Sequence, residues 1–141
     1  MENLINRALA AEKKLFILLA AAAIAVSVMA YDAPQFSQNP NAIYRLFPTQ
    51  NMYIYLRLDT RNGKIDMVQW NTDSENRLYT TLSSQNLLPS GQDPKAGRFT
   101  LYSTTNIYNF ILLDQTSGKM WQVQWSFDAL NRMVVPINKL E

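Results

Sequence analysis

The chain has 141 residues, which is room for one domain, and its 48% hydrophobic and 11% aromatic content is ample for a folded core. It has 13 basic and 11 acidic residues, so its formal net charge of +2 offers no basic stripe for a phosphate backbone, and we expect no nucleic-acid partner. The absence of histidine and cysteine removes the usual general base, the commonest metal ligand, thiol chemistry and disulfides. We expect no catalytic residue, no metal and no cofactor.

Residues 1–30 are predicted to be an export signal. The segment Leu15–Ala30 is uncharged and follows Lys13 and Lys14, and it ends in the small-residue pattern Val28-Met29-Ala30. This order is typical of a secretory signal that is cleaved after Ala30. An uncleaved membrane anchor is the alternative, although a span needs about 20 apolar residues. We therefore expect an exported protein, whether periplasmic, cell-surface or secreted, that meets a membrane only through this segment.

A linker is predicted at 31–42, and the remaining 43–141 is built from a tandem duplication. Aligning 44–82 with 99–137 without a gap gives 14 identical residues in 39 pairs. Self-similarity at a fixed spacing indicates that one structural unit occurs twice. The segment 83–97, which joins the two copies, is rich in turn-forming residues.

Each copy predicts a short antiparallel β-meander. Runs of aromatic and branched residues alternate with Asn, Asp and Gly, as they do along strands joined by turns. The sequence Asp-x-x-x-Gly-Lys, which ends at Lys64 and Lys119, predicts a hairpin closed by a glycine at positive φ. We expect an all-β domain of two meanders with three or four strands each. Because one meander has too little core by itself, the two should pack as a small sandwich or a partly closed barrel.

The alternation of side chains predicts which strand faces are buried. The runs 52–58 and 107–113 are apolar or aromatic on both faces, so we expect central strands covered on both sides. In the third run of each copy, Val and Trp share one face and Gln occupies the other, which predicts one buried and one wet face. The residues concerned are Val68 and Trp70 against Gln69, and Trp121, Val123 and Trp125 against Gln122 and Gln124.

The pattern Leu-Asp-x-x-x-Gly-Lys followed by Trp resembles the blade motif of quinoprotein-type β-propellers. The resemblance covers about a dozen residues of each copy, from Leu58 to Trp70 and from Leu113 to Trp125. The repeat here is longer than such a blade normally is. Two blades cannot close a propeller, and no functional family is identified from the motif.

The acidic residues are expected to hold turns. Asp59 and Asp114 recur at equivalent places, as do Asp73 and Asp128, and each lies in a predicted turn. The segment 71–76 spaces oxygen-bearing side chains as a calcium loop does, but 126–131 loses the spacing, so the turn interpretation is favoured. A hydrolase that uses paired carboxylates is disfavoured, because the sequence shows no pocket that would tune them.

The aromatic residues are the best candidates for a contact surface, since Trp and Tyr dominate binding hot spots. We expect a non-enzymatic binding module of the cell envelope that contacts a protein or a glycan. The alternative is a structural subunit of a homo-oligomeric envelope assembly, with contacts made by edge strands or by the faces that carry Tyr53 and Tyr108. The candidate contact residues are Trp121, Tyr53, Tyr55 and Tyr108.

The three tryptophans carry a further expectation. Trp70 and Trp125 are equivalent and should both be buried anchors of the core. Trp121 aligns with Asp66, a side chain that would be expensive to bury without a partner. Trp121 should therefore be at least partly exposed, or should lie where the second copy meets something that the first does not.

Overall fold

The computed structural model describes residues 39–140. The predicted export signal or anchor at 1–30 lies outside the described residues, as does most of the predicted linker at 31–42. The described part ends one residue before the last of the sequence, and all statements below concern this part of the chain.

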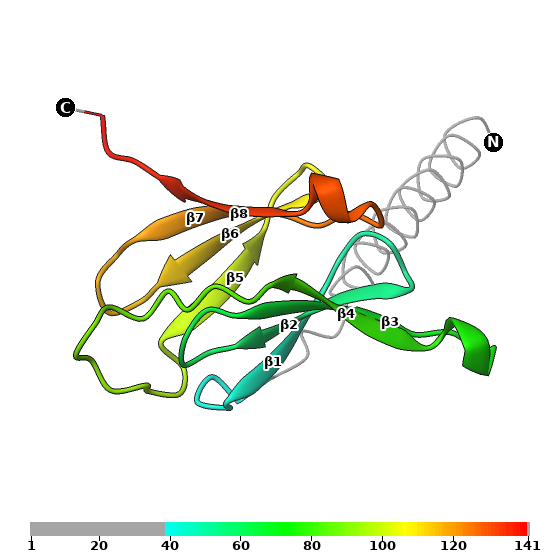
Figure 1. Ribbon diagram of the computed structural model, residues 1–141, viewed down its shortest axis with the longest axis horizontal. Helices are drawn as coiled ribbons and strands as arrows, with labels where there is room; N and C mark the ends of the chain where they lie inside the picture. The colour runs from blue at the N-terminus through cyan, green and yellow to red at the C-terminus, as the bar shows by residue number, and fades with distance from the viewer. Residues whose placement is uncertain (1–38, 141) are drawn as a thin grey trace, which may run out of the picture. The chain divides into compact units, whose positions relative to one another are not determined.

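The fold is all-β and consists of two four-stranded antiparallel sheets, one from each copy of the duplication (Figure 1). Strand follows strand in sheet order, so each sheet is a simple meander, as the sequence predicts. The first sheet contains β1 (Tyr44–Pro48), β2 (Ile54–Asp59), β3 (Ile65–Gln69) and β4 (Leu78–Ser83). The second sheet contains β5 (Phe99–Ser103), β6 (Asn109–Asp114), β7 (Met120–Gln124) and β8 (Met133–Ile137).

The turn between the second and third strands of each sheet forms as the Asp-x-x-x-Gly-Lys pattern predicts. In the first sheet, the Asp59 carboxylate accepts the amide of Arg61, and its carbonyl accepts the amide of Gly63. In the second sheet, Asp114 accepts the amide of Thr116 in the same way. Gly63 and Gly118 have φ values of 80° and 74°, where a side chain is strained.

The turns between the third and fourth strands are single turns of 3-10 helix, η1 (Ser74–Asn76) and η2 (Ala129–Asn131). Asp73 caps the first and Asp128 the second, each by accepting an amide two residues on. Both are far too short for a bilayer, and residues 39–140 contain no other helix. The acidic pairs therefore hold turns, as expected.

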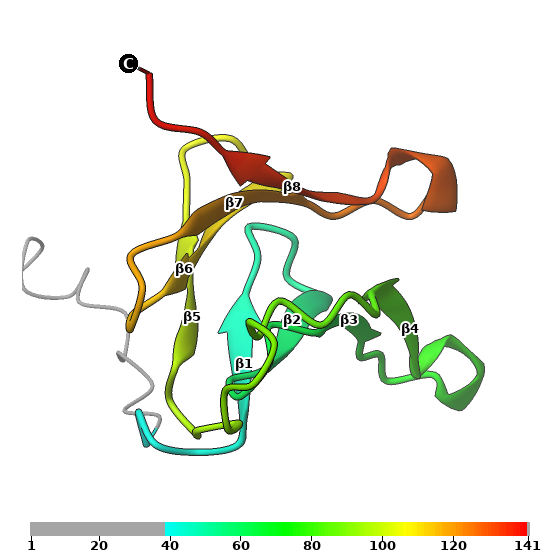
Figure 2. The same cartoon turned by 60° about the vertical axis from the view of Figure 1, so that its left-hand side comes forward.

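The two sheets pack against each other over one hydrophobic core (Figure 2). No ladder of hydrogen bonds joins a strand of one sheet to a strand of the other in 39–140, so the barrel alternative does not hold there. Hydrogen bonds also connect the sheets outside the core, and one of them runs from the amide of Gly97 to Thr60 Oγ1. The amide of Phe99 donates to the carbonyl of Thr60, Arg45 donates to Thr100, and Arg132 donates to Thr80 and Thr81.

The two sheets bury opposite faces of the same repeat. In the first sheet the buried side chains of β2 are Ile54, Leu56 and Leu58. Their equivalents in β6 are the half-buried Asn109, Ile111 and Leu113, and the buried residues are the intervening Phe110 and Leu112. The third strands show the same reversal. The core takes Ile65 and Met67 from β3, but Trp121 and Val123 from β7.

One expectation about strand faces is wrong, and another is met on one face only within 39–140. The central strands are covered on one face there, and the cover predicted for their other face does not come from these residues. The Val-Trp face of the third strand is buried in the second sheet, as predicted, but it is the open face in the first. Both copies would bury the same face only if they were related by a twofold axis. Here the second copy is stacked on the first in the same orientation, so opposite faces of the repeat meet in the core.

Candidate functional site

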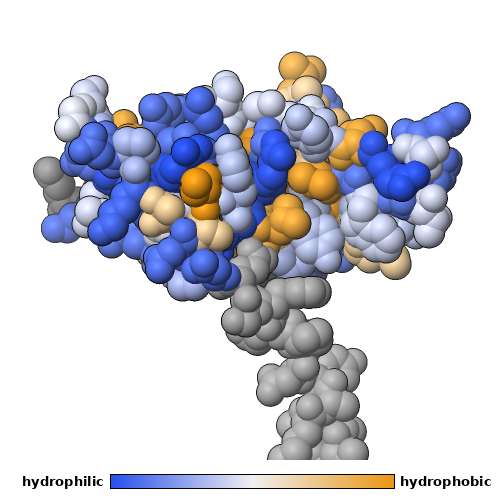
Figure 3. Space-filling view, turned by 90° about the horizontal axis from the view of Figure 1, so that it is seen from below, coloured by the Kyte–Doolittle hydropathy of each residue, from blue (hydrophilic) through white to orange (hydrophobic). Residues whose placement is uncertain are grey.

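We call the face of each sheet that points away from the other sheet its outer face. The outer face of the first sheet is equivalent, position by position, to the buried face of the second. It nevertheless carries large apolar and aromatic side chains, and Figure 3 shows apolar side chains reaching the surface on one side of the molecule. Its principal residues are Tyr44, Leu46, Tyr55, Val68, Trp70 and Tyr79.

A shallow depression marks the middle of this first outer face. It has a volume of about 310 Å³ and is lined by Leu46, Tyr55, Val68 and Trp70. Tyr79 on β4 lies opposite Val68 across the ladder and is 64% exposed. Large apolar and aromatic side chains are seldom exposed side by side on the surface of a sheet. The face therefore has the composition of an interface.

One ion pair crosses the first outer face. Arg57 donates two hydrogen bonds to Asp66, the shorter at 2.8 Å, and the guanidinium lies over the ring of Tyr79 at 4.6 Å from its centroid. The hydrogen bond to Asp66 raises the pKa of Arg57, so the group stays charged. The pair is neutral as a whole and is held flat against the sheet, which lets an apolar partner approach it.

The outer face of the second sheet is also partly apolar. Its exposed or half-buried members are Tyr102, Ile111, Leu113, Met120, Val135 and Ile137. Between them Gln122 donates to Asn109, a pair that occupies the places of Met67 and Ile54 in the first sheet. Each sheet thus buries one face of the repeat and presents the other face outwards. The two outer faces correspond, position by position, to the two faces that meet in the core.

Trp70 and Trp125 show how far the environments of equivalent residues differ. Each indole Nε1 donates to a carbonyl of the turn before the second strand, that of Met52 at 2.8 Å and that of Ile107 at 2.9 Å. Trp125 is 1% exposed, because it faces the core, whereas Trp70 is 43% exposed. The expectation that both are buried anchors is wrong for Trp70.

Trp121, the favoured contact residue, is buried in the core at 9% exposure, and its ring lies 6.2 Å from that of Phe99. The expectation that it would be at least partly exposed is wrong. It stands on the face of the second sheet that the first sheet covers, while Asp66 stands on the equivalent face that nothing covers within 39–140. Its other predicted setting, a place where the second copy meets something that the first does not, therefore describes it, and that something is the first sheet.

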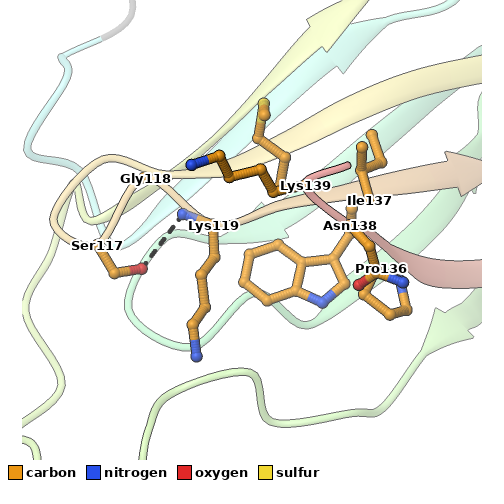
Figure 4. Close-up of a pocket in the computed structure, with 9 residues that line it drawn as sticks. Ser117, Gly118, Lys119, Pro136, Ile137, Asn138 and Lys139 are labelled. Atoms are coloured by element: carbon orange, nitrogen blue, oxygen red, sulfur yellow. Dashed lines mark hydrogen bonds between the residues drawn. The ribbon is translucent and has the colours of Figure 1, made fainter. Parts of the chain in front are cut away.

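The edge of Trp121 also lines an open groove of about 610 Å³ between the β6–β7 turn and the end of β8. Figure 4 shows Lys119 and Lys139 beside this groove, with Pro136, Ile137 and Asn138 along its other wall. The indole offers little surface for stacking because most of it is buried. The groove has a wide mouth and no acidic residue among those that line it, and we assign it no chemistry.

The other three predicted contact residues do not meet in one place. Tyr53 and Tyr108 are about half exposed and occupy equivalent turns, where each ring packs against Trp70 or Trp125 of its own copy, at 5.6 Å and 5.4 Å between ring centroids. Tyr55 belongs to the first outer face. The sequence interpretation missed Tyr44, Leu46 and Tyr79, which share that face. Comparing the two copies position by position would have found them, once the buried face of one copy was known.

Comparison of the chain with protein-family models, with curated proteins and with solved structures finds no match in any of the three. The candidate site therefore rests on the geometry of this molecule alone, and its two outer faces are the features that the fold leaves unexplained.

Proposed function

We propose that this chain is a non-enzymatic interaction module that binds protein through the outer faces of its two sheets. The observation that carries the proposal is the equivalence of the first outer face to the buried face of the second sheet. A surface of this kind already buries itself against protein inside the chain. The chain is expected to be exported and has no cysteine to form disulfides. Such surfaces therefore have to be stabilised by contact with other protein rather than by cross-links.

A glycan is the second candidate, because Tyr108 borders a small polar pocket of about 240 Å³ with Asn106, Asn109, Gln124 and Asn131. Exposed rings beside amides are typical of sugar sites. All four of these amides are already engaged, however, since Asn131 donates to the carboxylate of Asp128. Asn106 accepts the amide of Tyr108, Asn109 accepts from Gln122, and Gln124 donates to the carbonyl of Asn131. The apolar outer faces are therefore the stronger basis.

Site-specific photo-cross-linking in the native host tests the proposal. A photo-reactive residue is placed at Tyr79 on the first outer face, at Val135 on the second, and at Leu130 as control, because Leu130 is 93% exposed in η2 and belongs to neither face. We expect discrete protein adducts from Tyr79 and Val135 and none from Leu130. If neither face gives more protein adduct than Leu130, the proposed function is wrong.

A further inference from the structure

We propose that the partner of the first outer face is the second outer face of another copy of this chain, so that copies join head to tail and close into a ring. The inference rests on the proposed function and names its partner. It follows from the way in which the chain packs against itself, and four features of the two sheets support it.

The first support is the type of the internal interface. Two kinds of face exist in this repeat, and the chain joins one kind from the first sheet to the other kind from the second. The two faces that nothing covers within 39–140 are again one of each kind, with the kinds exchanged between the two sheets. An interface between unlike faces is heterologous, and it can be repeated by the next copy in the same sense.

The second support is an arginine that is present in both copies and used in only one. Arg132 donates to Thr80 Oγ1 and the Thr81 carbonyl of the first sheet, both at 3.3 Å, and so joins the two sheets. Its equivalent is Arg77, one of the 14 identical positions, which is exposed and whose side chain makes no hydrogen bond or ion pair within 39–140. In a head-to-tail contact, Arg77 would meet Val135 and the carbonyl of Pro136 of the neighbouring copy, the equivalents of Thr80 and Thr81.

The third support is a pair of main-chain groups. The amide of Phe99, at the start of the second sheet, donates to the carbonyl of Thr60 at 2.8 Å. The equivalents of these residues are Tyr44 and Gln115, which are exposed on opposite sides of the molecule's internal interface. The same step applied between copies brings the amide of Tyr44 to the carbonyl of Gln115.

The fourth support is a matched change in polarity. The internal interface has Leu112 and Trp121 on one side where the first outer face has Arg57 and Asp66. It has Ile54 and Met67 on the other side where the second outer face has Asn109 and Gln122. Both open faces are thus more polar than the pair that is buried permanently, as expected of surfaces that meet water before assembly. Neither face carries a net charge that would repel the other.

Closure of the ring follows from repetition. Each copy adds two sheets, and radial arrays of four-stranded sheets close with about four to eight sheets. A ring of two, three or four copies contains four, six or eight sheets, which lies within this range. In a closed ring every outer face is covered by the neighbouring copy.

The absence of cysteine allows a directional test in the full-length chain, kept in a mild non-ionic detergent. One chain carries Tyr44→Cys and a second carries Gln115→Cys, and a short thiol-specific cross-linker is added to each alone and to an equimolar mixture. We expect covalent dimers from the mixture only, because each contact joins one Tyr44 to one Gln115. As a control, a chain with Leu130→Cys replaces one of the two chains in the mixture, and no covalent dimer is expected. Native mass spectrometry of the unmodified chain should show two, three or four copies.

The substitution Tyr79→Asp gives the test its direction. Added to the chain with Tyr44→Cys, it places a charge in the contact and should lower the yield of covalent dimer by about ten-fold, as loss of a binding hot spot does. Added to the chain with Gln115→Cys, it lies on the face that this contact does not use, and the yield should be unchanged. The second variant also shows that the substitution leaves the domain folded.

Each remaining outcome contradicts the inference. Covalent dimers from either single-cysteine chain alone would mean that like faces meet, and a ladder of increasing masses would mean that the contacts do not close. A monomer at micromolar concentration that gives no dimer in the mixture would exclude self-association. Protein adducts of other masses in the photo-cross-linking experiment would then retain the proposed function with a different partner. A photo-cross-link between the outer face and another segment of the same chain would show that this segment, and not a second copy, covers the face.

Discussion

Trp70 and Trp125 make the same hydrogen bond to the same turn in two copies of one structural unit, yet only Trp125 is covered. Truncation of a buried Trp leaves a cavity and costs about 3–5 kcal/mol. We expect Trp125→Ala to lower the free energy of unfolding by about this amount and Trp70→Ala to lower it by less than half as much. Denaturant titration checks this in a chain that also carries Val135→Asp, which keeps the copies apart. Equal losses would show that Trp70 is as much a core residue as Trp125.

The two equivalent arginines should separate folding from assembly. Arg132→Met removes the hydrogen bonds to Thr80 and Thr81 that join the two sheets. It also removes those to the carbonyls of Ser126 and Phe127 in its own copy, and it should lower the melting temperature, since hydrogen bonds from a charged group contribute about 1.5–3 kcal/mol. Arg77→Met should leave the melting temperature of the separated chain unchanged and weaken the association of copies. Light scattering and thermal melts of the two variants make the comparison. A melting temperature that falls equally in both would contradict the distinction.

The buried ion pair between Arg98 and Asp114 should make stability depend on pH in the acid range. The two side chains are 4% and 1% exposed and 2.7 Å apart. Burial raises the pKa of Asp114, but the hydrogen bonds from Arg98 and Ser117 outweigh it and lower the pKa from 3.8 to about 2. Because the folded pKa is the lower one, the stabilisation is fully present above about pH 4 and is lost as the pH falls towards 2.

Replacement of Asp114 tests the origin of this dependence. Asp114→Asn leaves the charge of Arg98 buried without its partner and should cost about 3–5 kcal/mol at neutral pH. It should also flatten the loss of stability between pH 4 and 2. Asp59→Asn is the matched control, because Arg61, its partner, is 34% exposed, so its effect should be smaller. An unchanged acid slope in Asp114→Asn would assign the pH dependence to other groups.

The two hairpin glycines differ in what surrounds them. A Cβ at Gly63 would lie 3.0 Å from Cδ1 of Leu87, whereas a Cβ at Gly118 would meet nothing within 4 Å. Gly118→Ala should cost only the strain of its positive φ, about 1–3 kcal/mol. Gly63→Ala should cost more, since the loop that carries Leu87 must also move. Thermal melts of the pair check this. Gly118→Asn should be the mildest change, because Asn tolerates this conformation.

Processing of the N-terminus is a separate prediction from the sequence. The mature protein from the native host should begin at Tyr31, and intact-mass measurement checks this. A mass that includes residues 1–30 in a membrane fraction would support the uncleaved anchor. The full-length mass in the soluble cytoplasmic fraction would contradict export.

The sequence alone determined the units of this protein. The duplication, the strand order within each sheet and the Asp-x-x-x-Gly-Lys turns follow from local patterns, because a turn residue acts within a few positions of itself. The role of Asp73 and Asp128 as turn caps was predictable for the same reason.

Only the tertiary structure decided which face of each sheet is buried. Both faces of β2 and β6 are apolar enough to enter a core, so alternation within one strand cannot choose between them. The choice depends on whether the two copies stack in the same or opposite senses, which is a property of the pair. That choice buried Trp121 and exposed Trp70, and it left the face that carries Tyr79 without cover from residues 39–140.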